Sequence, residues 1–283
     1  MVLGMLLVPL MDACAKVLSR DYPVLEITWA RFMFHFLWLL PVVHWQRLPW
    51  WKMPPAPGIQ MVRSLFLTLA TLSFFLAIKE NPIPNALALL FISPLVVTLV
   101  APFVLNECFD RKRAGAVVVG FIGVLVVLRP ASDEFQPSVL FALGAGVGYA
   151  CYLMATRKLA NRSAPLLTLF HTAIAGLLLL SAMVPAVWIT PDAKGWGLMA
   201  LMGLFAAAGH YMVIRACEYA SASLLSPFNY TEIITASTVS YLLFDYFPDA
   251  MVWVGMTIIS LSGIYISMLE YRNNKKLLEN VDL

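Results

Sequence analysis

Ten blocks of about twenty apolar residues fill nearly all of this chain and leave no stretch long enough for a water-soluble core. A helix needs about 20 apolar residues to cross the hydrocarbon region of a bilayer. Of the 283 residues, 61% are hydrophobic and 12% are charged. Soluble domains carry roughly 25% charged residues. We therefore predict an all-α integral membrane protein.

The apolar blocks predict ten transmembrane helices joined by short connections. The expected spans are 2–19, 24–45, 58–78, 83–105, 114–129, 138–156, 164–188, 196–214, 222–244 and 250–269. Because the connections are short, no soluble domain is expected and the helices must form one bundle. An even number of spans places both termini on the same side of the membrane.

The basic residues predict the orientation, because Lys and Arg concentrate in cytoplasmic connections. With a cytoplasmic N-terminus, twelve fall inside: Arg47, Lys52, Arg111, Lys112, Arg113, Arg157, Lys158, Arg162, Arg215, Arg272, Lys275 and Lys276. Four fall outside: Arg20, Lys79, Arg129 and Lys194. We therefore predict a multi-pass protein of a bacterial-type inner membrane with both termini cytoplasmic. A net charge of +3 gives no indication of nucleic-acid binding.

The two halves of the chain read as versions of one another. The matching pairs are 86–107 with 223–245 and 115–128 with 255–268. Both members of the first pair end on an acidic residue, Glu107 and Asp245. We predict two five-helix repeats, residues 1–130 and 131–283. Since five is odd, the second repeat enters from the opposite side, so the repeats are inverted about an axis in the membrane plane.

Five motifs point to a known family: DACAK (12–16), PVLEITWARF (23–32), SPLVVTLVAPFVLNE (93–107), GFIGVLVVLRP (120–130) and SPFNYTEI (226–233). Through them the chain resembles the drug/metabolite transporter superfamily, in its EamA-domain branch. The resemblance implies a central cavity lined by the first four helices of each repeat, with the fifth as scaffold. Similar members are proposed to import riboflavin or S-adenosylmethionine, and others export amino acids, metallophores or other metabolites.

Asp12 and Lys16 lie four residues apart in the first span, so they share one helix face. An ionisable group at bilayer depth costs about 2.5–3.5 kcal/mol on insertion scales, so it faces the bundle interior or a watery cavity. One interpretation is an internal salt bridge that neutralises both residues. The other makes Asp12 a proton or cation site with Lys16 as its partner.

The second span carries Thr28, Arg31, His35 and Trp38 along one helical stripe. An indole stacks on flat ligands, and a guanidinium pairs with carboxylate or phosphate. We predict that Arg31, His35 and Trp38 bind a flat, polar, partly anionic substrate. The alternative is a structural ion pair from Arg31 to one of three acids, Asp12, Glu26 or Glu232.

The span 222–244 is the most polar one. Pro227 removes a backbone donor and loosens the helix start, so freed carbonyls beside Asn229 can bind a ligand. We predict that Asn229, Tyr230 and Glu232 contact the substrate. Asn85, at the start of the fourth span, is a further candidate.

Three residues are candidates for proton coupling: Asp12, Glu232 and His210. His210 shares a face with Gly203 and Ala207, where small residues allow close helix approach. A lone buried histidine is also a common packing residue, so both interpretations of His210 stand.

The leading hypothesis is a secondary transporter that moves a small organic metabolite by alternating access, with proton coupling as an extension. The substrate is riboflavin-like or S-adenosylmethionine-like, or an amino acid or other metabolite for efflux. The sequence has no GxxxxGK[ST] motif, so energy must come from an ion gradient, from exchange or from the substrate's own gradient. The alternatives are a non-transporting scaffold subunit and, with weaker support, a membrane-embedded enzyme.

No cofactor or metal is expected, because the four cysteines are scattered without a CxxC pair and the histidines form no HExxH motif. The expected partners are the lipid bilayer and a small-molecule metabolite. A second copy of the chain in a homodimer is a further option.

Overall fold

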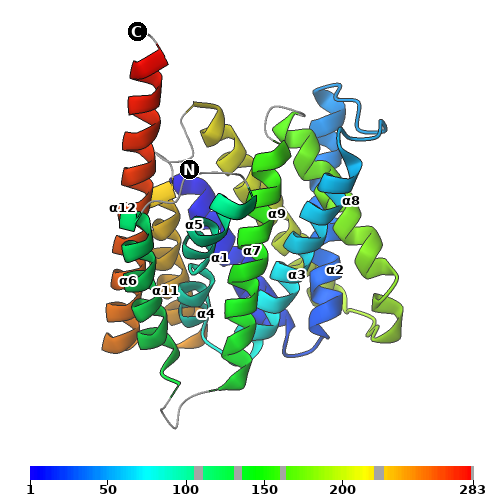
Figure 1. Ribbon diagram of the computed structural model, residues 1–283. Coiled ribbons are helices and arrows are strands. Elements are labelled where there is room, and N and C mark those ends of the chain that lie inside the picture. The colour runs from blue at the N-terminus through cyan, green and yellow to red at the C-terminus, as the bar shows by residue number, and fades with distance from the viewer. Residues whose placement is uncertain (105–110, 131–135, 160–163, 220–225, 282–283) are drawn as a thin grey trace.

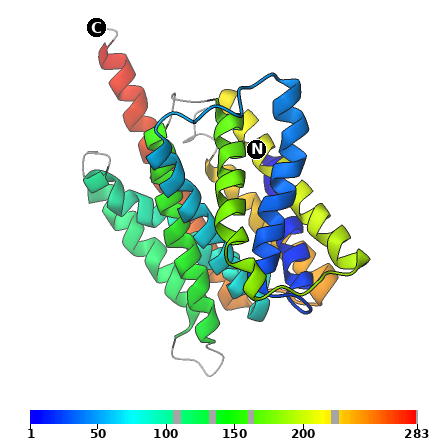
Figure 2. The same ribbon diagram turned by 90° about the vertical axis from the view of Figure 1, so that its right-hand side faces the viewer.

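The structure is a computed structural model that describes residues 1–104, 111–130, 136–159, 164–219 and 226–281. Glu107 and Arg162 lie outside these ranges. Within them every regular element is a helix, as the apolar blocks predict. The helices lie side by side in one bundle, and the last helix extends beyond its neighbours (Figure 1; Figure 2).

The helices follow the expected apolar blocks closely. The α-helices are α1 (Val2–Leu18), α2 (Val24–Trp45), α3 (Pro57–Glu80), α4 (Ile83–Leu90), α5 (Ser93–Val104), α6 (Arg111–Leu128), α7 (Leu140–Leu159), α8 (Pro165–Ser181), α9 (Ala193–Tyr219), α11 (Thr231–Phe244) and α12 (Ala250–Val281). Three short 3-10 helices are η1 (Pro137–Val139), η2 (Val184–Ala186) and η3 (Ser226–Tyr230). The expected span 24–45 coincides with α2.

Several of these helices suit a bilayer. Within the described residues, six helical segments are long and apolar enough to cross a membrane: Pro57–Glu80, Ile83–Val100, Pro137–Leu159, Pro165–Ala186, Ala193–Val213 and Ala250–Leu269. On α6, large apolar side chains point outward, with Val118 62% and Ile122 52% exposed. A contiguous exposed apolar surface marks contact with lipid or a partner. Together these features describe a membrane-embedded bundle.

The expected span 83–105 is broken into two helices, α4 and α5. Pro94 has no N–H to donate to the carbonyl one turn earlier, so α4 ends at Leu90 and a new helix, α5, begins with Pro94 in its first turn. The break packs against α7, where a Cβ on Gly146 would lie 2.5 Å from the Ile92 side chain and 2.9 Å from the Leu90 carbonyl oxygen. Only glycine fits this contact.

The start of the span 222–244 is also irregular, as Pro227 predicts. Residues Ser226–Tyr230 form the 3-10 helix η3, and the α-helical part, α11, begins at Thr231. Asn229 and Tyr230 therefore lie on a tighter turn than the rest of the helix. Each half of the chain thus contains one helix that is modified at a Ser-Pro pair.

The main helix contacts join the two halves of the chain. α3 packs along α7, α1 along α9, α6 along α12, and α2 against both α8 and α9. α6 and α12 approach closely because a Cβ on Gly123 would lie 3.0 Å from the Gly255 carbonyl oxygen. These contacts place α1, α2, α9 and α11 around a common interior.

Candidate functional site

A group of charged and imidazole side chains lies inside the bundle. The group, here called the Arg31 cluster, comprises Asp12 on α1, Arg31 and His35 on α2, His210 on α9 and Glu232 on α11. Asp12 is 1%, Arg31 2% and His35 2% exposed. Such side chains are rare at membrane depth and mark substrate or ion pathways.

Arg31 makes few contacts for a buried cation. Its Nε donates to Met11 Sδ at 3.4 Å, its Nη2 lies 3.2 Å from His210 Nε2, and its guanidinium lies 4.7 Å from the centre of the Phe32 ring. Its Nη1 has no hydrogen-bond partner among the described residues. A guanidinium carries five N–H donors, so Arg31 is left with donors free for a ligand.

Asp12 also makes few contacts for a buried acid. Its Oδ1 has no hydrogen-bond partner in the part of the chain that the structure describes. The expected salt bridge with Lys16 is wrong, because Lys16 Nζ donates instead to the carbonyl oxygens of Ile78 at 2.5 Å and Asn81 at 2.7 Å. A cation is favoured there because carbonyls at a helix C-terminus lack intrahelical partners.

Arg31 also does not form the alternative ion pair to an acid. Among the described residues, the ion pair within 4 Å is that of Arg129 with Asp249. Asp12 nevertheless follows Met11, which accepts a hydrogen bond from Arg31, and α1 packs against α11, which carries Glu232. Glu232 is 8% exposed in the first turn of α11. The cluster thus holds charges of both signs without direct pairing.

His35 and His210 stack on one another across the α2–α9 contact. Their ring centroids are 5.9 Å apart and their planes differ by 9°. Within the described ranges, neither ring nitrogen of His35 has a hydrogen-bond partner. The close approach depends on Gly203, where a Cβ would lie 3.0 Å from the His35 backbone nitrogen. The predicted small-residue face beside His210 is confirmed.

Other predicted substrate contacts lie elsewhere. Trp38 is 42% exposed and its Nε1 donates to the Ala200 carbonyl at 3.0 Å, so the structure does not bring it to the cluster. Tyr230 packs its ring 5.1 Å from the Phe91 ring and places its hydroxyl against Gly263 on α12. Asn229 is half-buried in η3.

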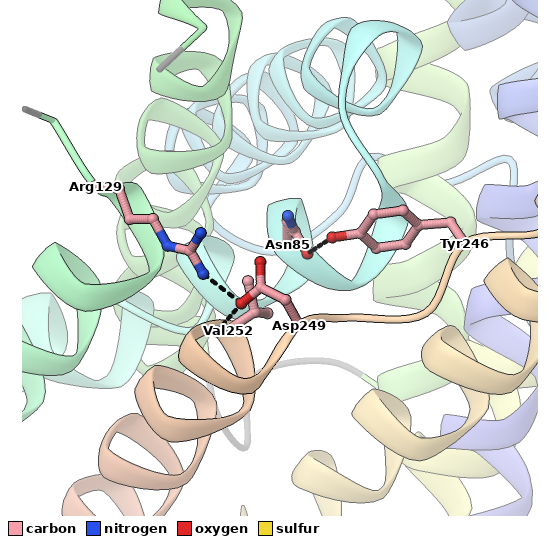
Figure 3. A network of polar contacts seen from close by, with 5 residues as sticks. All are labelled: Asn85, Arg129, Tyr246, Asp249 and Val252. Atoms are coloured by element: carbon pink, nitrogen blue, oxygen red, sulfur yellow. Dashed lines mark hydrogen bonds and ion pairs between the residues drawn. The ribbon is translucent and has the colours of Figure 1, made fainter. Parts of the chain in front are cut away.

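Asn85 belongs to a polar network at the end of the bundle opposite the C-terminus (Figure 1; Figure 3). Its Oδ1 accepts from the Tyr246 hydroxyl at 3.1 Å. Beside it Arg129 pairs with Asp249, whose Oδ1 also accepts from the Val252 backbone N–H at 3.0 Å. We call these five residues the Asp249 network. It ties α4 and α6 to the connection between α11 and α12.

The electrostatics of Asp249 follow from this network. Partial burial alone raises the pKa of its carboxyl, but the Val252 N–H, the Arg129 hydrogen bond and the Arg129 charge outweigh burial. The pKa of Asp249 therefore lies below its ordinary value of 3.8. The carboxylate form, and with it the ion pair, is stabilised.

A second buried arginine, Arg63, forms hydrogen bonds that the sequence analysis did not predict. Arg63 on α3 is 4% exposed. Its Nε donates to Thr156 Oγ1 at 2.7 Å, its Nη2 to the Tyr152 hydroxyl at 2.9 Å, and its Nη1 to Thr168 O at 3.3 Å and to Thr172 Oγ1. Gln60, one turn earlier, donates to the same Thr168 and Thr172 oxygens.

We call Gln60, Arg63 and these four partners the Arg63 junction. It joins α3 to α7 and α8 entirely through neutral acceptors. The spacing of Gln60 and Arg63 by three residues was the available sequence signal, because both then lie on one helix face. Arg63 anchors α3 to α7 and α8, whereas Arg31 keeps a hydrogen-bond donor that no described residue uses.

The Arg31 cluster has the side chains needed to bind a polar ligand. It offers guanidinium and imidazole donors together with carboxylate acceptors, which can hold a polar metabolite away from lipid. Among the described residues, no group of three or more His, Cys, Asp or Glu side chains is placed to ligate a metal ion.

Known proteins resemble this chain over three quarters of its length or more. The S-adenosylmethionine uptake transporter of Rickettsia prowazekii is 26% identical over 262 residues, covering 93% of this chain and 89% of the relative. The riboflavin transporter of Vibrio cholerae is 27% identical over 220 residues, covering 75% and 72%. The pseudopaline exporter of Pseudomonas aeruginosa is 24% identical over 261 residues, covering 91% and 90%.

A solved crystal structure shares the fold, with a TM-score of 0.65 over 96% of this chain and 97% of that one at 18% identity. The sequence model of the EamA-like transporter family matches twice, at residues 1–129 and 136–269. Its matches cover both halves of the apolar bundle described above. The chain therefore belongs to the EamA-like transporter family, within the drug/metabolite transporter superfamily, and is a multi-pass membrane transporter of small metabolites.

Proposed function

We propose that the protein is a secondary transporter that moves a small organic metabolite by alternating access around the Arg31 cluster. The observation that carries the proposal is a set of buried charges contributed by α1, α2, α9 and α11, with polar atoms that lack partners among the described residues. Because α1 and α2 come from one half and α9 and α11 from the other, relative motion of the halves would remodel the site.

We further propose ten transmembrane helices in two inverted five-helix repeats, residues 1–130 and 131–283, with α4 and α5 forming one broken span. The packing supports this arrangement. Exchanging the repeats converts the α1–α9 contact into the α3–α7 contact and the α2–α9 contact into the α3–α8 contact, and all four are present. The two separate matches of the family model support the same division.

Substrate contacts are assigned to Arg31, His35, Asn229 and Glu232. Of these, Arg31 and His35 keep polar atoms unpaired within the described residues, which supports a direct role. Relatives are named for S-adenosylmethionine uptake, riboflavin transport and pseudopaline export, so substrates of this size and polarity suit the family. The buried carboxylates of Asp12 and Glu232 are proposed to exchange protons during the cycle.

The cytoplasmic face is assigned to the end that holds the C-terminus, in a bacterial inner membrane. The assignment follows from the excess of Lys and Arg in the connections at that end. It makes the Asp249 network a contact of the outer face. Lipid and a metabolite are then the partners that transport requires.

The test is counterflow uptake in proteoliposomes, with a metabolite panel that includes S-adenosylmethionine, riboflavin and amino acids, at two pH values. We expect saturable uptake of at least one compound and a pH dependence that Glu232→Gln removes. Lys79→Gln, which alters an exposed residue, is the control. Absence of uptake for the whole panel would favour a scaffold subunit, and a Glu232→Gln protein with full pH-dependent uptake would exclude Glu232 from coupling.

A further inference from the structure

The Arg31 cluster has two poles of opposite charge on different helices. The cationic pole is Arg31 on α2, which lies beside His210 on α9. The anionic pole is formed by the buried carboxyl groups of Asp12 on α1 and Glu232 on α11, two helices that pack against each other. The structure pairs neither pole with the other within 4 Å among the described residues.

Each pole has one buried polar atom without a hydrogen-bond partner among the described residues, a donor at the cationic pole and an acceptor at the anionic pole. At the cationic pole, Arg31 Nη1 is a buried donor without an acceptor in the described part of the chain. At the anionic pole, Asp12 Oδ1 is a buried acceptor that likewise has no donor among those residues. Buried polar groups are nearly always satisfied, so two such atoms in one cluster favour the binding of a polar ligand there.

The Arg63 junction shows that this chain can satisfy a buried arginine when it needs only an anchor. Arg63 is as buried as Arg31, and its donors meet hydroxyl and carbonyl oxygens on α7 and α8. Arg31 is surrounded by poorer acceptors, a thioether and an imidazole. The difference lies in the partners supplied, and it leaves Arg31 suited to a carboxylate.

A ligand with a single charge leaves one pole uncompensated. An anion would satisfy Arg31 but bring a further negative charge toward Asp12 and Glu232. A cation would satisfy the two acids but leave the guanidinium donors of Arg31 unpaired. A neutral ligand removes water from both poles without supplying charge to either, and buried charges without a partner are strongly unfavourable.

We propose, on the basis of the transporter function above, that the Arg31 cluster recognises a zwitterion, binding its carboxylate at Arg31 and its ammonium or sulfonium group at Asp12 and Glu232. The substrate class is therefore a metabolite with an amino-acid head group. His35 stacks on His210 beside Arg31 and has both ring nitrogens unpaired among the described residues, so it adds a neutral hydrogen bond at the cationic pole.

A ligand series with the charges removed in turn tests this assignment. S-adenosylmethionine carries a carboxylate, an ammonium and a sulfonium group. Decarboxylated S-adenosylmethionine keeps the ammonium and sulfonium groups but has no carboxylate. Methylthioadenosine has none of the three charged groups, and riboflavin is an unrelated neutral compound. L-Methionine is a zwitterion without the nucleoside. Binding of each is measured by calorimetry on the detergent-purified protein, and uptake of each in proteoliposomes.

We expect the zwitterions to bind roughly tenfold or more tightly than the ligands that lack a carboxylate. Arg31→Gln should abolish that preference while leaving the affinity for decarboxylated S-adenosylmethionine within about threefold. Glu232→Gln should weaken both cationic nucleosides and leave methylthioadenosine unchanged. Arg31→Lys keeps the charge and serves if Arg31→Gln does not fold. Lys79→Gln removes one surface charge and controls for net charge.

The outcomes separate this inference from the transporter function. Uptake of riboflavin or a singly charged ligand, unaffected by Arg31→Gln, would overturn the zwitterion assignment and leave the transporter standing. Binding and uptake of no compound of any charge class would overturn both. Preference for a zwitterion that survives Arg31→Gln, or that Arg31→Lys leaves at full strength although lysine cannot bind a carboxylate through two N–H groups, would overturn the assignment of Arg31 to the carboxylate.

Discussion

The Arg63 junction and the Arg31 cluster each contain an almost fully buried arginine, but the two arginines differ in their hydrogen-bond partners. At the junction, four hydrogen bonds from Arg63 to neutral oxygens connect α3 with α7 and α8. In the cluster, Arg31 meets a thioether and an imidazole, and its Nη1 is unpaired among the described residues. The comparison teaches that satisfied donors hold helices together, whereas unsatisfied donors are available to a ligand.

The largest expected effect on stability is that of Arg63→Gln. The shorter side chain cannot reach all of the oxygens on α7 and α8, so several buried acceptors lose their donor. We expect the free energy of unfolding to fall by roughly 2–4 kcal/mol. Thermal unfolding in detergent measures the change.

Arg31→Gln is the matched variant that would break this comparison. It removes a buried cation with few favourable contacts, so we expect the free energy of unfolding to change by less than about 1 kcal/mol. Uptake, however, should fall strongly. An equal loss of stability in both variants would show that Arg31 is an anchor as well.

Gly203→Ala should have the next largest effect. A Cβ at this position would overlap Phe34 and crowd the His35 backbone, so α2 and α9 must separate and the His35–His210 stack is disturbed. We expect a loss of roughly 1–3 kcal/mol together with reduced uptake. Thermal unfolding and proteoliposome uptake report the two effects.

Gly197→Ala on the same helix is its control. No described atom lies within 4 Å of a Cβ placed there. Alanine favours the helix over glycine by about 1 kcal/mol, so this variant should be neutral or more stable. Similar losses in both variants would point to the glycine backbone of α9 and away from the α2–α9 contact.

Asp249→Asn should have a small, pH-dependent effect, because the ion pair with Arg129 is solvent-accessible. We expect a loss below about 1 kcal/mol at pH 7. Since the folded-state pKa of Asp249 lies below 3.8, the stabilisation is present above that value and is lost as the pH falls through the folded-state pKa. Melting temperatures of the wild type and the variant should therefore converge in acid, and a gap that persists there would contradict this origin.

Trp38→Phe should have the smallest effect. The indole loses one hydrogen bond to the Ala200 carbonyl at the bundle surface, which corresponds to roughly 0.5 kcal/mol. Uptake should change less than about twofold. A loss of uptake as large as that of Arg31→Gln would extend the site to this exposed face of α2.

Much of the fold was predictable because the length of each apolar segment determines where a membrane helix begins and ends. The helices α1 and α2 begin and end where the apolar pattern does, and Pro227 correctly indicated an irregular start for the polar span. The break before Pro94 was not predicted. A proline near the middle of an apolar run is compatible with a continuous kinked helix, and the structure resolves the choice through the contact of Ile92 with Gly146.

The site was predictable only within single helices. The spacing of Arg31 and His35 placed both on one face of α2, and both are buried. Trp38 lies on nearly the same face but is exposed, because periodicity gives the direction of a side chain and not what packs against it. The contact of Arg31 with His210 joins residues 179 positions apart, and no local pattern encodes it. Lys16 had a local partner available and bonds to distant carbonyls instead.

The hydrogen bonds from Lys16 to the carbonyls of Ile78 and Asn81 connect α1 with the end of α3. Lys16 lies one turn beyond Asp12 on α1, and its acceptors lie at the carboxyl end of α3. A rotation of α1 that reorients Asp12 would have to break or shift these two hydrogen bonds. Lys16 therefore links the helix that carries Asp12 to the helix that carries Arg63, through two hydrogen bonds at the carboxyl end of α3.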